Sequence, residues 1–206
     1  MLLSSNGLVI PVVVWGKEPI SHRITSVCAL LHTRIVVTGS EEGFICVWKF
    51  DEEYKLQPVL LLAGHDGAVL ALCKAHQKSE GDEFFSSDQN GNLLLWNSSD
   101  GRCVQSSTSR YVHTQLSVQA VDFGESVSEF LFCAGRYSEI VAISPKNLQV
   151  LVRFASRVEP DWISAFCLFG TKQKSDVIIG VTVAGLVKIW SLQNVAENVS
   201  MTLIIK

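Results

Sequence analysis

The sequence predicts an all-β protein, a β-propeller of about four four-stranded blades that form an incomplete ring. A short motif recurs along the chain: a tryptophan stands five residues after a glycine in segments 43–48, 91–96 and 185–190. The first two tryptophans are 48 residues apart and the last two are 94 apart, so one copy is expected midway. Segment 138–143 supplies it, with serine and isoleucine in place of glycine and tryptophan. A period of this length is typical of a propeller blade.

Each repeat also contains four short runs of strand length. They are rich in β-branched and aromatic residues and are bounded by turn residues, which is the pattern of β-strands. Two to five polar or glycine residues join the second run to the third, which is hairpin spacing. The expected strands are 24–31, 34–39, 43–48 and 58–62, then 68–74, 83–87, 91–96 and 103–107, then 116–123, 129–134, 138–143 and 148–154, and finally 163–169, 176–182, 185–190 and 201–205.

These runs divide the chain into one leading strand and four blades. We expect the leading strand within 1–19, and blades over 20–62, 63–110, 111–156 and 157–206, of which the third is degenerate. In a closed ring the leading strand would complete the last blade, and propellers of this kind usually have more than four blades. The sequence therefore predicts an open arc whose two outer faces lack a neighbouring blade.

Composition and charge narrow the class of protein. The net charge of −3 and the scattered lysines and arginines give no reason to expect nucleic acid as a partner. The apolar run 8–15 contains Pro11 and is too short for a transmembrane segment, and it lacks the basic leading region of a signal peptide. We expect a cytoplasmic protein.

The six cysteines are interpreted as small core residues. Counting back 23 residues from the last residue of the motif gives Cys73, Ala120 and Cys167, and Cys28 stands 20 residues before Trp48, with a shorter loop between. A small residue therefore recurs at one point of the first strand, where close packing favours a small side chain. No pair has the short spacing of a zinc or redox motif. Neither a metal site nor a disulfide framework is expected.

No motif of a catalytic centre or of a nucleotide site is found. The chain has no Gly-x-Ser-x-Gly elbow, no Walker loop and no dinucleotide fingerprint. The acidic groups 41–42 and 51–53 fall at turns or just beyond a strand and are expected to be solvated surface. His65 has the residue type of a general base or metal ligand, but its spacing to Trp96 favours a structural role. We expect no catalytic residue, metal or cofactor.

The second repeat resembles a WD repeat, because Gly64-His65 precedes Trp96 by the separation usual in that family. In WD repeats a histidine, a serine or threonine, an aspartate and the tryptophan are hydrogen-bonded in series. Carried over by position, the resemblance implies the series His65, Ser86, Asn90 and Trp96, with Asn90 where an aspartate is usual. The other repeats are degenerate. The expected repeat anchors are Trp48, Trp190, Gly43, Gly91 and Gly185.

A wider resemblance covers most of the chain. Segments 13–16, 99–103, 160–164 and 183–190 resemble the amino-terminal propeller of the rabconnectin-three beta family of WD-repeat proteins. Members of that family are large cytoplasmic scaffolds on vesicle membranes, and they regulate the vacuolar proton pump together with a DMX-like alpha subunit. The resemblance implies that this chain is a fragment or truncated form. It also implies peripheral association with endosomal or synaptic-type vesicles through protein partners.

The expected function is that of a non-enzymatic platform for protein interactions, part of a regulator of proton-pump assembly and organelle acidification. Two alternatives remain: a generic WD-repeat adaptor of another complex, and a propeller enzyme with a central pocket. An enzyme needs convergent acidic or histidine residues at corresponding loop positions, and Ser138 and Ala184 do not supply them. Asp161 and Trp162 are the candidate partner contact, although Trp162 could instead be a packed loop anchor.

Overall fold

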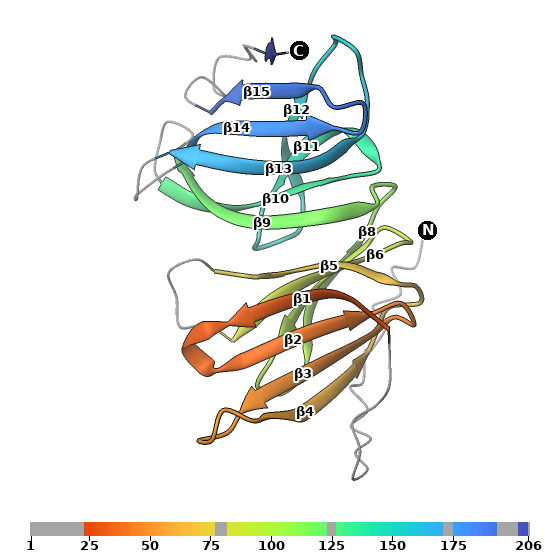
Figure 1. The fold of residues 1–206 in the computed structure, drawn as a ribbon, viewed down its shortest axis with the longest axis vertical. Coiled ribbons are helices and arrows are strands. Elements are labelled where there is room, and N and C mark those ends of the chain that lie inside the picture. Colours follow the sequence, from red (N-terminus) through yellow and green to blue (C-terminus); the bar gives the residue numbers. More distant parts are fainter. Residues whose placement is uncertain (1–22, 77–81, 123–126, 171–174, 193–201, 206) are drawn as a thin grey trace, which may run out of the picture.

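A computed structural model describes residues 23–76, 82–122, 127–170, 175–192 and 202–205. Sixteen strands and one 3-10 turn, η1 (Leu31–Thr33), make up its regular structure. The strands group into four blades stacked in an arc (Figure 1). Blades 1 and 2 contain β1 (Ile24–Leu30), β2 (Ile35–Ser40), β3 (Phe44–Phe50) and β4 (Leu56–Ala63), then β5 (Val69–Lys74), β6 (Glu83–Asp88), β7 (Asn92–Asn97) and β8 (Cys103–Thr108). Blades 3 and 4 contain β9 (His113–Asp122), β10 (Val127–Gly135), β11 (Tyr137–Ile143) and β12 (Val150–Ala155), then β13 (Ile163–Gly170), β14 (Ser175–Thr182), β15 (Val187–Ser191) and β16 (Thr202–Ile205).

Within each blade the four strands are antiparallel and lie in chain order. A single parallel bridge between Val121 and Ser175 links blades 3 and 4 into one eight-stranded sheet. The predicted fold class is confirmed: the protein is an all-β propeller with an incomplete ring. Each expected strand within the described residues is present, with ends that differ by a few residues. The expected leading strand, 8–15, lies outside the described residues.

The core lies between successive blades, and strand alternation builds it. Neighbouring side chains on a strand point to opposite faces, so Phe84 faces blade 1 and Phe85 faces blade 3. The recurring position of the motif always faces the preceding blade: Trp96 packs on blade 1, Ile143 on blade 2 and Trp190 on blade 3. Trp96 and Trp190 are fully buried, and burial of such side chains is a large favourable contribution to folding. The repeat therefore encodes the blade-to-blade interface.

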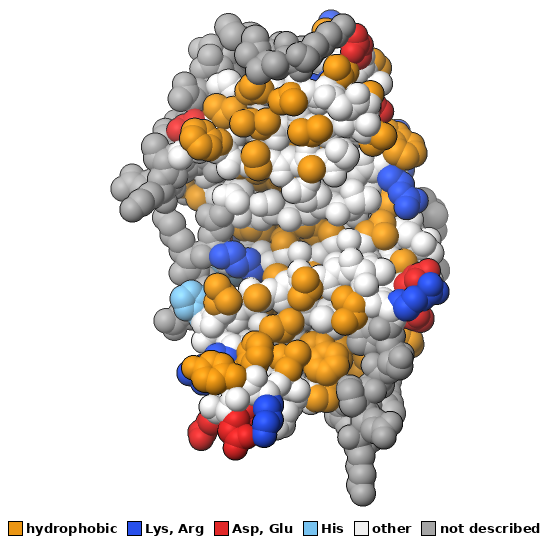
Figure 2. All heavy atoms as spheres, in the orientation of Figure 1, with side chains coloured by type: hydrophobic (Ala, Val, Ile, Leu, Met, Phe, Trp, Pro, Cys, Tyr) orange, Lys and Arg blue, Asp and Glu red, His pale blue; other side chains and the backbone are white. Residues whose placement is uncertain are grey.

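The outer faces of the arc carry exposed apolar side chains. On blade 4 the face opposite Trp190 includes Phe169 and Val181, which are 70% and 36% exposed. On blade 1 the face that carries Trp48 includes Val27, 65% exposed. Figure 2 shows hydrophobic side chains gathered over β13 and β14 and again over β1 and β2. No further blade covers either face in the described part of the chain.

The strand ladders correct two expectations about the small residues. Cys28, Cys73 and Cys167 do occupy equivalent places in the first strands of their blades. Each stands one residue before the residue that lies level with the motif tryptophan across the sheet. In blade 3 that place belongs to Ser117, because β9 and β10, with ten and nine residues, form a longer hairpin than the first two strands of the other blades and shift Ala120 out of step. Cys167 is exposed rather than buried, because no other blade of the described chain covers its face of blade 4.

The remaining thiols are enclosed and free. None of the six cysteines forms a disulfide in the structure, whose described residues include all of them. Burial raises the pKa of the Cys28 thiol to about 11 and that of Cys46 to about 12. A thiol is nucleophilic or metal-binding only as thiolate, so these cysteines act as packing residues.

Candidate functional site

A buried hydrogen-bond series joins three elements of blade 2. His65 precedes β5, Ser86 lies on β6, and Trp96 lies on β7. Trp96 Nε1 donates to Ser86 Oγ at 2.8 Å, and Ser86 Oγ lies 2.6 Å from His65 Nε2. His65 Nδ1 lies 3.1 Å from Asp88 Oδ2. An indole nitrogen only donates, so a consistent direction runs from Trp96 through Ser86 and His65 to the Asp88 carboxylate.

The fourth member of this series is Asp88, which corrects the assignment of Asn90. Asp88 ends β6 and is fully buried, whereas the Asn90 side chain is exposed in the following turn. Asn90 contributes only its backbone N–H, which donates to Asp88 Oδ1 at 2.9 Å. Asp88, two residues before Asn90 and still within β6, supplies the carboxylate because its side chain points back toward His65.

Asp88 also shapes the turn between β6 and β7. Asn92 donates to it twice, from its backbone nitrogen at 2.9 Å and from its side-chain amide at 2.7 Å. Burial on its own raises the pKa of Asp88, but the hydrogen bonds from His65 and Asn92 outweigh burial and hold this pKa below its usual value. The carboxylate is therefore ionised at neutral pH and ties the loop before β5 to the turn after β6.

Ser86, His65 and Asp88 have the residue types and order of contacts of a nucleophile, base and acid in hydrolases. The Ser86 hydroxyl, however, is fully buried between His65 and the Trp96 indole, which donates to its oxygen. A substrate carbonyl has no access to this oxygen. The arrangement fixes the geometry of the blade and does not serve as a catalytic centre.

The other blades keep fragments of this series. In blade 1 Trp48 Nε1 donates to Thr38 Oγ1 at 2.8 Å, with Thr38 in the place of Ser86. In blade 3 the buried His113 is paired through Nδ1 with the Tyr137 hydroxyl at 2.7 Å, a partner the sequence did not suggest. In blade 4 Trp190 Nε1 lies 3.4 Å from the Ala155 carbonyl oxygen, to which it donates.

Backbone conformation and close packing explain why glycine stands at the expected anchor positions. Gly43, Gly91 and Gly185 all have φ between 81° and 88°, in the left-handed region that side chains disfavour. A Cβ at Gly43 would lie 2.5 Å from the His65 carbonyl oxygen, and one at Gly91 would lie 2.1 Å from that of Ser109. The turns at Gly43 and Gly91 therefore pack against the loop of the next blade, whereas a Cβ at Gly185 would meet no described atom within 4 Å.

Within each blade, a backbone hydrogen bond also joins the central turn to the loop before the first strand. The turn between the second and third strands donates to the loop before the first strand, in the pairs Glu41 to Arg23, Gln89 to Ala68, Arg136 to Val112, and Val183 to Trp162. Their lengths are 2.9 to 3.1 Å. Together these turns and loops form what we call the loop surface, residues 23, 41–43, 64–68, 89–91, 109–112, 136, 157–162 and 183–185. The β2–β3 and β14–β15 turns both lie at the right of Figure 1.

In blade 4 the loop surface presents the expected pair Asp161 and Trp162. Asp161 Oδ2 accepts from the Ala184 backbone nitrogen at 2.7 Å, and Oδ1 accepts from the Trp162 backbone nitrogen at 2.8 Å. The hydrogen bond from Ala184 is the main reason that the pKa of Asp161 lies below its usual value. The Trp162 side chain is 52% exposed. Its backbone is held while its ring faces solvent.

The chemistry of the loop surface changes from blade to blade. Blade 1 exposes Glu41 and Glu42, blade 3 exposes Arg110 and Arg136, and blade 4 exposes Trp162 beside Val183. Carboxylates, guanidinium groups and an apolar patch on one backbone framework suit recognition of another protein, where exposed aromatic anchors contribute much of the affinity.

Two findings concern metals and membranes. Across residues 23–76, 82–122, 127–170, 175–192 and 202–205, no three histidine, cysteine or acidic side chains are grouped to hold a metal ion. Nor does this part of the chain contain a helix long and apolar enough to cross a membrane.

Comparison with known proteins finds WD-repeat relatives. No protein-family model matches the chain. WD repeat-containing protein 72 of Pongo abelii and that of Homo sapiens are each 32% identical to it over 91% of its length, and the protein of Mus musculus is 29% identical. The chain spans 17% of the length of these relatives. The repeated four-stranded blades, the hydrogen-bond series of blade 2 and these similarities identify the chain as a WD-repeat protein.

Proposed function

We propose that this chain is a docking module of a vesicle-associated scaffold that regulates assembly of the vacuolar proton pump, and so controls organelle acidification. WD-repeat propellers act as platforms that bind other proteins. The proposal adds a non-catalytic role, a place on the cytoplasmic side of endosomal or synaptic-type vesicles, and two partners, the pump subunits and a DMX-like alpha subunit. Its support is the resemblance to the rabconnectin-three beta family.

One structural observation carries the proposal. Residues 160–162 and 183–185, which belong to the two segments 160–164 and 183–190 that resemble that family, meet on the loop surface. The hydrogen bond from the Ala184 nitrogen to Asp161 joins them at 2.7 Å. At this junction Trp162 and Val183 are 52% and 65% exposed. A resemblance that includes an exposed junction, and not only the core, favours a shared partner.

The mechanism requires no chemical step. The loop surface is held by hydrogen bonds in all four blades, so little conformational entropy is lost when a partner binds. Weak contacts at several blades would add up, because the second contact forms within an already bound complex. The scaffold would thereby hold pump subunits close to one another and favour their assembly.

The test uses cells that lack the full-length protein and are complemented with it. Vesicle luminal pH, read with a ratiometric probe, should rise in the deficient cells and return to normal with the wild-type protein. Complementation with Trp162→Ala should fail, whereas Tyr54→Ala should succeed, since Tyr54 is an exposed aromatic outside the loop surface. Unchanged luminal pH in the deficient cells would remove the proton-pump role.

A further inference from the structure

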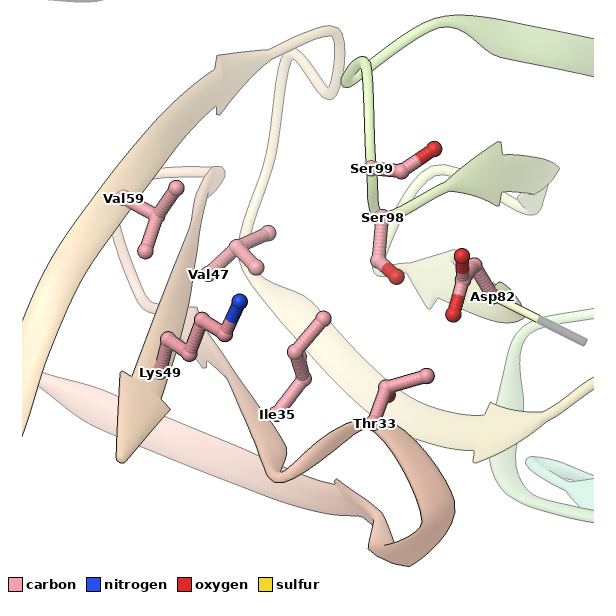
Figure 3. Close-up of a pocket in the computed structure, with 8 residues that line it drawn as sticks. All are labelled: Thr33, Ile35, Val47, Lys49, Val59, Asp82, Ser98 and Ser99. Carbon is pink, nitrogen blue, oxygen red and sulfur yellow. The ribbon is translucent and has the colours of Figure 1, made fainter. Parts of the chain in front are cut away.

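A cavity of about 370 Å³ opens between blades 1 and 2 (Figure 3). It lies at the opposite end of the blades from the loop surface, since it is lined by the start of β2, the end of β3 and the residues that flank β6 and β7. Ile35, Val47 and Val59 of blade 1 give it an apolar wall. Its volume is within the range of side-chain and small-ligand sites in proteins.

Blade 2 contributes two buried polar atoms that have no hydrogen-bond partner among the described residues. Ser98 is only 2% exposed, and its Oγ forms no hydrogen bond with the described residues. The same holds for Oδ1 of Asp82. The Ser98 backbone nitrogen donates to the Asp82 carbonyl oxygen at 2.7 Å, which keeps the two side chains together. Leaving such atoms unpaired in a buried site is costly, so this wall is prepared for a hydrogen-bond donor.

The facing wall carries the opposite charge. Lys49 extends from β3 toward the cavity, while Asp82 and Ser98 approach from blade 2 (Figure 3). No ion pair joins Lys49 to Asp82 in the described part of the chain, and the Lys49 side chain is exposed. Water can therefore solvate the Lys49 ammonium, but the buried Asp82 oxygen depends on whatever enters the cavity. The unpaired Asp82 oxygen therefore makes the cavity prefer a cationic hydrogen-bond donor as its ligand.

We propose that this cavity binds an arginine side chain presented by an extended segment of a partner protein. The arginine stem lies along Ile35, Val47 and Val59, and its guanidinium donates to Asp82 Oδ1 and Ser98 Oγ. A guanidinium offers several donors in one plane, so it can satisfy a carboxylate and a hydroxyl side by side, whereas a lysine presents a single point charge. The Lys49 ammonium donates to a main-chain carbonyl of the same segment. This inference rests on the proposed role as a scaffold only in taking a protein as the ligand.

The test measures peptide binding to the full-length protein by fluorescence anisotropy. The probe is a labelled heptapeptide with a central arginine between valines, and its twin carries citrulline, which keeps the shape and removes the charge. Since hydrogen bonds to charged groups are worth more than neutral ones, the citrulline peptide should bind at least about tenfold more weakly. This comparison needs no protein variant.

Three variants locate the binding site. Asp82→Asn should weaken binding of the arginine peptide at least about tenfold and should abolish the difference between the two peptides. Ser98→Ala should weaken it less, because a neutral acceptor is lost. Glu52→Gln, which removes an exposed carboxylate outside both the cavity and the loop surface, should leave binding unchanged.

The outcomes separate this proposal from the role at the proton pump. Equal binding of the two peptides to the wild-type protein, or an unchanged affinity in Asp82→Asn, would show that the unpaired atoms are merely hydrated and would overturn the proposal. Peptide binding that depends on Asp82 in a protein without effect on vesicle pH would support the cavity and refute the pump role. A protein that restores vesicle pH but binds the two peptides equally would support the pump role and refute the cavity proposal.

Discussion

His65 and Asp88 are 23 residues apart in sequence and are joined at 3.1 Å, with both side chains fully buried. This contact closes the hydrogen-bond series of blade 2 and ties its first loop to its central turn. Two buried charged or polar groups that satisfy each other make the blade sensitive to loss of either one, because the remaining partner cannot return to water.

The first prediction concerns Ser86, which links Trp96 to His65. Ser86→Ala leaves the buried Trp96 Nε1 and His65 Nε2 without their partner, so it should lower the free energy of unfolding by about 1–3 kcal/mol. Urea denaturation of the wild-type and variant chains measures the difference. Ser106→Ala, at an exposed site in β8, is the matched control and should have little effect. Equal midpoints for Ser86→Ala and Ser106→Ala would contradict the structural role of the series.

The second prediction compares two glycines with the same backbone conformation. Gly91 and Gly185 have φ of 81° and 83°, but a Cβ at Gly91 would meet the Ser109 carbonyl oxygen, while one at Gly185 would meet no atom within 4 Å. Both alanine variants share the strain of a positive φ. Gly91→Ala should be the more destabilising by about 1–3 kcal/mol, because only there must packed backbone move. Equal losses on urea denaturation would contradict the packing of the β6–β7 turn on blade 3.

The third prediction concerns acid stability. Burial lowers the pKa of His113 from 6.5 to about 4, so between these values the unfolded chain binds a proton that the folded chain excludes. Stability should therefore fall as the pH drops from 6.5 toward 4, by on the order of 3 kcal/mol over the whole window. The pKa of Asp88 is lowered from 3.8, so its contribution is lost only at more acidic pH.

The control for this pH dependence is His113→Gln, which cannot be protonated. Its unfolding free energy, measured from pH 7 to pH 4, should fall less steeply than that of the wild type. Parallel pH profiles for the two proteins would show that another group is responsible.

The fourth prediction follows from the uncovered face of blade 4. The isolated 206-residue chain should self-associate, because Phe169 and its neighbours expose apolar surface on an open sheet. Phe169→Lys should reduce association, measured by sedimentation velocity over a range of concentrations. Leu31→Lys changes an equally apolar residue of η1, away from that face, and should not. A wild-type chain that stays monomeric throughout would contradict this account.

Much of the fold could be predicted from the sequence because strand length and a regular period are local properties. The positions of β2, β6, β10 and β14 follow from runs of β-branched and aromatic residues, and the motif ending at Trp96 fixes the face that meets the preceding blade. The error at Asn90 arose because Asp88 at the end of β6, Asn90 in the turn and Asn92 at the start of β7 are all polar residues close together in sequence. Only the direction of each side chain decides which of them reaches His65.

Other parts of the site depend on contacts between distant strands or between blades and leave no local signal. The pairing of His113 with Tyr137 joins two strands across 24 residues. The cavity brings Lys49 near Asp82 and Ser98 only because blades 1 and 2 pack at a particular angle. The exposure of Cys167 depends on the absence of a neighbouring blade in the described residues, which the cysteine itself does not encode.

The most direct test of the central claim, that the loop surface of blade 4 binds the partner, is quantitative co-purification. The full-length wild-type protein, Trp162→Ala and Tyr54→Ala would each be captured from cells, and the recovered pump subunits and DMX-like alpha subunit would be measured by mass spectrometry. We predict that Trp162→Ala loses at least about 90% of these partners, as expected when an exposed aromatic anchor is removed, while Tyr54→Ala retains them. Equal recovery with Trp162→Ala and wild type would contradict the claim.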